Sequence, residues 1–207
     1  MTALRARLAG LDEYDALAVT ALLWFLGLTA RYTFPPLFPT FQATYGVSNT
    51  TLGLLFTALM TTYAGMQFPS GALADRFGAV RVIAAGALTL AAASLLLAAS
   101  QFFAVLVVSM VLIGVGTGAH KTVTINLLST LYPARTGRVL GVLDAVGGLS
   151  GVLAPALVVA VLSASLGWNL IFVGIGAGGV ALAAATRLRV PIRMRESPEI
   201  EGDSDVD

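Results

Sequence analysis

The 207-residue chain has no cysteine, one histidine and few charged side chains. Without cysteine there can be no disulfide, thiol nucleophile or thiolate metal site. The histidine, His120, has no carboxylate near it in the sequence, so we expect neither an enzyme nor a metal or cofactor site. Charged residues make up 11% of the chain and hydrophobic residues 57%, whereas soluble domains carry about a quarter charged residues. This composition predicts a membrane protein with no nucleic-acid partner.

Long apolar runs fill most of the sequence. Each is close to the ~20 residues that a helix needs to cross a ~30 Å hydrocarbon layer. The runs are continuous and rich in Ala, Leu, Gly and Val, which favours helices over the alternating strands of a barrel. We predict an all-α fold with six transmembrane helices, at 16–38, 51–73, 80–100, 102–128, 139–163 and 168–186. Residues 1–15 would form an N-terminal segment, 16–187 the bundle and 188–207 a polar, acidic tail.

The basic residues are distributed unequally between the two faces of this predicted bundle. Of the 12 Lys and Arg residues, all but two fall on one side when the spans are threaded alternately: Arg5, Arg7, Arg76, Arg81, Arg135, Arg138, Arg187, Arg189, Arg193 and Arg195. The positive-inside rule then places both termini in the cytoplasm and the chain in the cell membrane as a multi-pass protein. The remaining two, Arg31 and Lys121, lie within predicted spans.

The connection between the second and third predicted spans reads "QFPSGALADRFGAVRVI". We expect Gly71 to admit a close helix neighbour, Asp75 to cap the next helix and Gly78 to permit a tight loop. The series Gly71, Leu73, Ala74, Asp75, Arg76 and Gly78, followed by Arg81, resembles the loop signature of the major facilitator superfamily. The later stretch "YPARTGRVLG", with Arg135 and Arg138, is similar to the second cytoplasmic loop of that family.

The resemblance implies a secondary transporter that works by alternating access, with a substrate cavity between two six-helix bundles. This chain covers only the first bundle. Its second half would be another copy of the chain, a separate polypeptide or a part lost by truncation, and we favour the homodimer. In the family, the aspartate at the position of Asp75 latches onto a helix of the other half. Met110 and Ile113 replace an Arg and a Gln common in relatives, and Ala154 precedes Pro155 where antiporters show Gly-Pro, which argues against a proton-coupled drug antiporter.

The two cations inside spans are the candidate substrate ligands. Counting ~1.5 Å per residue, Arg31 lies about 22 Å and Lys121 about 15 Å from the cytoplasmic ends of their helices. An arginine at this depth of the first span is similar to the arrangement in anion carriers of the family. Its planar fork donates paired hydrogen bonds to an oxyanion. We expect Arg31 and Lys121 to bind an anionic metabolite or inorganic anion, with Tyr63 and Gln67 as donors and Trp24 shaping the pocket.

Several of these assignments have alternatives. Asp144 lies about 10 Å from its own helix end, so a structural or gating ion pair with Lys121 is as well supported as a substrate contact. His120 is either a proton shuttle or a hydrogen-bonded packing residue. A lone bundle would expose Arg31 and Lys121 to lipid, at a cost of at least about 2.5 kcal/mol per charge, so we expect a cover on that face. The competing function is a membrane interaction protein, or a transporter remnant, that moves no substrate.

Overall fold

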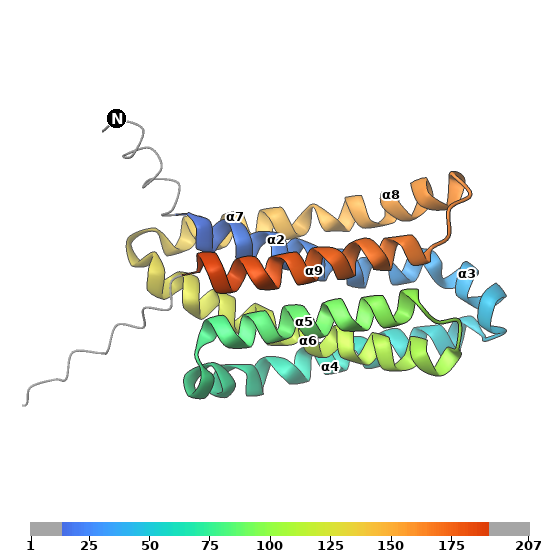
Figure 1. The fold of residues 1–207 in the computed structure, drawn as a ribbon, viewed down its shortest axis with the longest axis horizontal. Coiled ribbons are helices and arrows are strands. Elements are labelled where there is room, and N and C mark those ends of the chain that lie inside the picture. Colours follow the sequence, from blue (N-terminus) through green and yellow to red (C-terminus); the bar gives the residue numbers. More distant parts are fainter. Residues whose placement is uncertain (1–13, 191–207) are drawn as a thin grey trace, which may run out of the picture.

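The computed structural model describes residues 14–190, and all regular secondary structure in that range is helical, as predicted. In chain order the elements are α2 (Asp15–Tyr32), α3 (Phe34–Tyr45), α4 (Asn49–Phe77), α5 (Ala79–Ala98), α6 (Phe103–Leu131), η1 (Pro133–Arg135), α7 (Thr136–Gly148), α8 (Ser150–Ser163) and α9 (Asn169–Arg189). The helices run along one long axis as an elongated bundle (Figure 1). The predictions for 1–13 and 191–207, which include Arg5, Arg7, Arg193 and Arg195, lie outside the described residues.

Helices occupy all six segments that were predicted to span the membrane, but fewer qualify as spans by length and composition. Within the described residues, four do: α5, α6, the run Pro133–Ser163 and α9. The pair α2 and α3 qualifies as a fifth when it is joined across its 41° bend. That bend coincides with Pro35 and Pro36 at the start of α3, where proline lacks the backbone donor that would continue the preceding helix. The 29-residue α4 is long enough but too polar to qualify.

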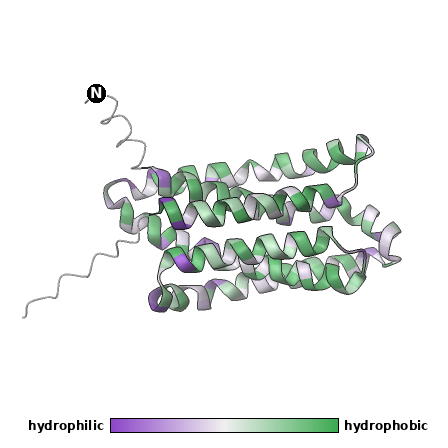
Figure 2. Ribbon diagram, viewed as in Figure 1, coloured by the Kyte–Doolittle hydropathy of each residue, from purple (hydrophilic) through white to green (hydrophobic). Residues whose placement is uncertain are grey.

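One end of the bundle is rich in arginine. There α2 begins, α9 ends, and the α4–α5 and α6–α7 connections lie (Figure 1). This arginine-rich end carries Arg76, Arg81, Arg135, Arg138, Arg187 and Arg189. Hydrophilic residues concentrate at the helix ends, and apolar residues cover the helix lengths between them (Figure 2). At this end Arg189 pairs with Asp15 at 3.1 Å, which ties the end of α9 to the start of α2.

Glycines let α4, α5, α6 and α9 pack closely. A Cβ added at Gly116 of α6 would lie 2.7 Å from the carbonyl oxygen of Gly86 of α5, and one at Gly179 of α9 would lie 2.9 Å from the Cβ of Ala91. Real Cβ atoms do not approach another heavy atom this closely, so the helix separation depends on the absence of a side chain. A Cβ at Gly114 of α6 would likewise lie 2.5 Å from the carbonyl oxygen of Leu59 of α4, so α6 packs between α4 and α5, and α9 packs against α5.

The loop between α4 and α5 corrects two predictions. Helix α4 continues to Phe77, so Asp75 lies exposed in its last turn, and the N-cap of α5 is Gly78, with no side-chain cap. The predicted cap by Asp75 is therefore wrong. Nothing lies within 4 Å of a Cβ built on Gly71, so the predicted close helix neighbour is also wrong within the described chain. The tight loop at Gly78 is confirmed, since its φ of +88° favours glycine.

Candidate functional site

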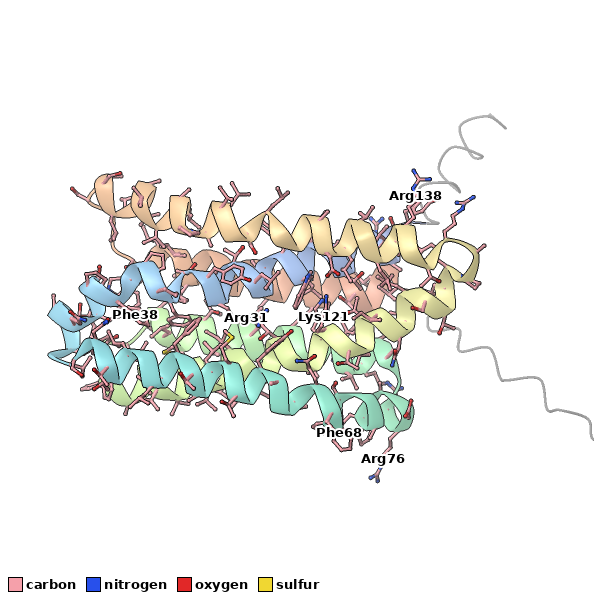
Figure 3. The ribbon with its side chains drawn as sticks, turned by 180° about the vertical axis from the view of Figure 1, so that it is seen from behind. Arg31, Phe38, Phe68, Arg76, Lys121 and Arg138 are labelled. Atoms are coloured by element: carbon pink, nitrogen blue, oxygen red, sulfur yellow. The ribbon has the colours of Figure 1, made fainter. Side chains whose placement is uncertain are left out.

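Arg31 lies in the last turn of α2, near the middle of the bundle (Figure 3). The ring centroid of Tyr63, from α4, lies 3.9 Å from its guanidinium carbon, and that of Trp24 lies 5.5 Å away. Only 4% of Arg31 is exposed. The expectation that a lone bundle would leave Arg31 open to lipid is therefore wrong, because two aromatic rings cover it.

The charge of Arg31 has no acidic partner among residues 14–190. Its Nε is buried and has no hydrogen-bond acceptor in the described chain. The faces of the aromatic rings offer a cation–π attraction, worth roughly 0.5 to 2 kcal/mol, but they neutralise no charge. A full positive charge thus remains inside the bundle with an unused donor.

Lys121 of α6 pairs with Asp144 of α7, with Nζ 2.6 Å from Oδ1. This confirms that the two side chains reach each other, the contact expected if Lys121 forms a structural or gating ion pair. Nζ also lies 4.2 Å from the ring centroid of Trp24. Trp24 therefore contacts both cations. The pair is unequally buried, because the side chain of Lys121 is 18% exposed and that of Asp144 is 64% exposed.

His120 uses both of its ring nitrogens. Nε2 lies 3.2 Å from the carbonyl oxygen of Thr20, and Nδ1 lies 3.0 Å from Oγ1 of Thr124. Because a carbonyl only accepts, Nε2 must donate, and in the neutral ring Nδ1 then accepts from the Thr124 hydroxyl. His120 is 5% exposed. Its ring is tilted relative to that of Trp24, and the two ring centroids lie 6.3 Å apart. These contacts favour the packing role over the proton shuttle.

The structure brings together most of the residues singled out from the sequence. We call the following set the central cluster: Trp24, Arg31, Tyr63, His120, Lys121 and Asp144. Gln67 lies one turn beyond Tyr63 on α4, and its side chain makes no hydrogen bond or ion pair with a described residue. The predicted role of Gln67 as a donor thus has no contact to support it in this conformation.

Sequence reasoning missed Gly147. A Cβ at this position of α7 would collide with Cδ1 and Nε1 of Trp24. Gly147 therefore allows α7 to press against the indole and bring Asp144 within reach of Lys121. The Gly147–Gly148 pair inside an apolar run was the available signal, because small residues in membrane helices often mark close contacts.

The residues of the two loop signatures lie at the arginine-rich end, away from the central cluster. Figure 3 shows Arg76 and Arg138 at that end, and Arg31 and Lys121 nearer the middle. The guanidinium carbon of Arg76 lies 5.3 Å from the ring centroid of Phe77, and Arg135 donates to the hydroxyl of Tyr14. Their positions suit contacts at a helix end and exclude direct contact with an anion bound at Arg31.

Comparison with known proteins identifies a family and, among the similar sequences, two proteins named as transporters. The family model described as Major Facilitator Superfamily matches residues 20–205. A Cupriavidus necator protein named "Probable sulfoacetate transporter SauU" is 29% identical over 162 residues, which cover 78% of this chain and 37% of that protein. A protein of Corynebacterium glutamicum named "Gentisate transporter" is 31% identical over 199 residues, which cover 90% of this chain and 42% of that protein.

The fold also matches a solved structure. A bacterial homologue of the human lysosomal transporter Spinster, in an inward-facing and unoccupied conformation, superposes with a TM-score of 0.80 at 20% identity. The match covers 93% of this chain and 46% of the other. The chain thus spans about two fifths of the length of the two transporters described above and about half of this structure.

Proposed function

The chain belongs to the Major Facilitator Superfamily, and we propose that it forms the first half of a secondary transporter that moves a small anion by alternating access. In this proposal all six helical segments cross the cell membrane. The arginine-rich end faces the cytoplasm, as do residues 1–15 and 188–207 on either side of the bundle at 16–187. The excess of arginine at one end supports this orientation.

The charge of the central cluster carries the proposal. Arg31 and Lys121 bring two positive charges, and Asp144 brings one negative charge, which leaves one positive charge uncompensated. A charged side chain inside a bilayer is costly, and such a residue is by default a candidate functional site. A carboxylate would neutralise this positive charge, and the guanidinium could offer paired hydrogen bonds, including the unused donor at Nε.

The preferred substrate is an organic anion with a carboxylate. Sulfoacetate and gentisate, the compounds in the names of the two relatives, both carry one. In the present conformation the ring of Tyr63 occupies the face of Arg31. Paired hydrogen bonds to a carboxylate lie in the plane of the guanidinium, so Tyr63 covers one face of Arg31 and leaves the N–H donors at its edge to the anion.

The site also needs a cover, which we propose is a second bundle and, in the simplest case, a second copy of this chain. The carboxylate of Asp144 is largely exposed on α7. Nothing lies within 4 Å of a Cβ built on Gly148 or Gly151 of the same face. An exposed carboxylate is unfavourable in lipid, whereas open glycines suit close helix contact. A two-fold pair is the commonest closed assembly.

Thermal stabilisation of the purified full chain by a panel of anions tests the anion site. A ligand at 100 times its Kd stabilises the folded state by about 2.7 kcal/mol. We expect sulfoacetate or gentisate to raise the melting temperature of the wild type. Arg31→Lys should lose most of this rise, because an ammonium cannot form the fork. The control is Arg138→Lys, at the arginine-rich end, which should keep it.

Equal shifts in Arg31→Lys and the wild type would rule out Arg31 as the anion ligand. The second candidate function is a membrane interaction protein that transports nothing. It is favoured by the contacts that already engage both cations, Lys121 with Asp144 and Arg31 with two rings. This alternative predicts that no anion raises the melting temperature, even when a dimer is present.

A further inference from the structure

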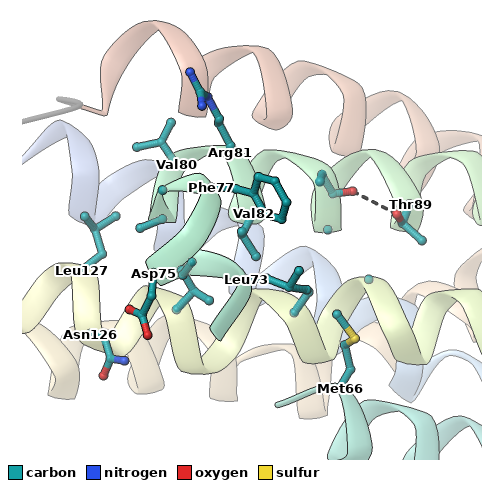
Figure 4. Close-up of a pocket in the computed structure, with 18 of the residues that line it drawn as sticks. Met66, Leu73, Asp75, Phe77, Val80, Arg81, Val82, Thr89, Asn126 and Leu127 are labelled. Atoms are coloured by element: carbon teal, nitrogen blue, oxygen red, sulfur yellow. Dashed lines mark hydrogen bonds between the residues drawn. The ribbon is translucent and has the colours of Figure 1, made fainter. Parts of the chain in front are cut away.

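A groove at the arginine-rich end lies outside the central cluster. It opens between α4 and α5, has α6 as its floor, and encloses about 1050 Å³ (Figure 4). Most of its walls are apolar, with side chains from three helices: Leu73 of α4, Val82 of α5, and Val123 and Leu127 of α6. None of its lining residues belongs to the central cluster. Because α6 presents Lys121 to one side and Val123 to the other, the groove is a separate site.

Two arginines lie at the rim of the groove. Arg81 is in the first turn of α5 and Arg187 in the last turn of α9, and both are exposed. The side chain of Arg81 extends toward α9 (Figure 4). Neither arginine forms an ion pair with a residue in 14–190. The rim also includes the exposed carboxylate of Asp75. The two arginines and this carboxylate together carry a net charge of +1.

We propose that this groove binds an anionic phospholipid, with one acyl chain between α4 and α5 and the phosphate at Arg81 and Arg187. The walls provide the apolar surface that an acyl chain needs. The two free guanidiniums lie where the headgroup of a lipid in the adjoining leaflet would sit, and anionic headgroups attract basic residues at this level. Arginine also matches phosphate through bidentate hydrogen bonds.

Charge complementarity selects this occupant over others. A free inorganic phosphate would use the two arginines but leave the apolar walls unfilled. A hydrophobic peptide would fill the walls but leave the arginines without partners. A phospholipid with a negatively charged headgroup satisfies both, and Asp75 then disfavours more than one phosphate at the rim. The inference depends on the membrane setting of the chain and not on the proposed anion substrate.

Native mass spectrometry of the full chain, released from mild detergent with added lipid, tests the site. The probes are phosphatidylglycerol and phosphatidylcholine with the same acyl chains. We expect one phosphatidylglycerol to remain bound per chain. The double variant Arg81→Gln/Arg187→Gln should weaken it by at least about tenfold, since each basic residue near the surface contributes to headgroup attraction. The matched control is Arg76→Gln/Arg138→Gln, two exposed arginines of the same end that do not line the groove.

A second variant probes the acyl chain independently. Ala85→Phe on α5 would place a ring in the groove from an exposed position and should displace both lipids, while circular dichroism confirms that the helices remain. The proposal would be overturned if the two double variants lost phosphatidylglycerol equally. It would also be overturned if phosphatidylcholine bound as tightly as phosphatidylglycerol.

Discussion

Glycines on the two sides of the bundle have opposite surroundings. On the side formed by α5, α6 and α9, an added Cβ at Gly116 or Gly179 would collide with a neighbouring helix. On the α7–α8 side, Gly141, Gly148 and Gly151 have nothing within 4 Å of such an atom. Of the residues in the 18-residue apolar stretch of α5, 61% are buried inside the bundle. In the corresponding stretch of the run Pro133–Ser163, 22% are buried. On the first side the glycines pack against neighbouring helices of the same chain. On the second side they are open and could pack against a helix of another bundle.

Substitution of a packed glycine should have the largest effect. In Gly116→Ala the new Cβ would lie 2.7 Å from the backbone oxygen of Gly86 and 2.8 Å from the backbone nitrogen of Leu90, and neither atom can move without shifting a helix. We expect a loss of about 3 kcal/mol in the free energy of unfolding, measured by thermal or denaturant unfolding in detergent. Gly151→Ala is the control and should be neutral or stabilising by up to about 1 kcal/mol. Equal losses in both variants would refute the contrast between the two sides.

Gly147→Ala should have an intermediate effect, because Gly147 is the only glycine of α7 that has a neighbour within 4 Å of an added Cβ. Its Cβ would push against the indole of Trp24, a side chain that can shift at a cost of about 2 kcal/mol. The emission of Trp24, measured in a Trp168→Phe background, should change as the ring moves. An unchanged spectrum and stability would show that α7 does not rest on Trp24.

The ion pair on the open side should contribute less. Asp144→Asn removes the partner of Lys121, but the exposure of Asp144 limits the loss in the free energy of unfolding to about 1 kcal/mol. A double-mutant cycle with Lys121→Gln isolates this coupling. A coupling within about 0.3 kcal/mol of zero would mean that the contact contributes nothing to the fold.

Gly151→Leu should have the smallest effect on the bundle itself and should act on assembly instead. The side chain would enter open space, so stability of the bundle should change by no more than about 0.5 kcal/mol. If α8 contacts a second bundle there, the dimer fraction in native mass spectrometry should fall. An unchanged mass distribution, with a dimer present in the wild type, would place the interface elsewhere.

The sequence predicted the helical segments and the family, which follow from hydropathy and motif spacing. From depth alone it gave the ion pair of Lys121 with Asp144 as one of two alternatives, and the structure contains that ion pair. It did not predict that Tyr63 covers Arg31. That contact depends on how α4 is rotated about its axis, and α4 is polar enough that hydropathy does not define a buried face. Two loop predictions failed for local reasons. Asp75 does not cap α5 because α4 continues two residues beyond it, and Gly71 has no close neighbour within the described chain.

Binding of a small organic anion at Arg31 can be followed directly through Trp24. The chain has two tryptophans, so Trp168→Phe leaves Trp24, whose ring centroid lies 5.5 Å from the guanidinium carbon of Arg31, as the indole reporter. The measurement is a fluorescence titration of this variant with sulfoacetate, against choline chloride at equal ionic strength. The proposal predicts a saturable change with sulfoacetate that Arg31→Lys abolishes and Arg138→Lys retains. A folded Arg31→Lys variant with the same saturable change would contradict it.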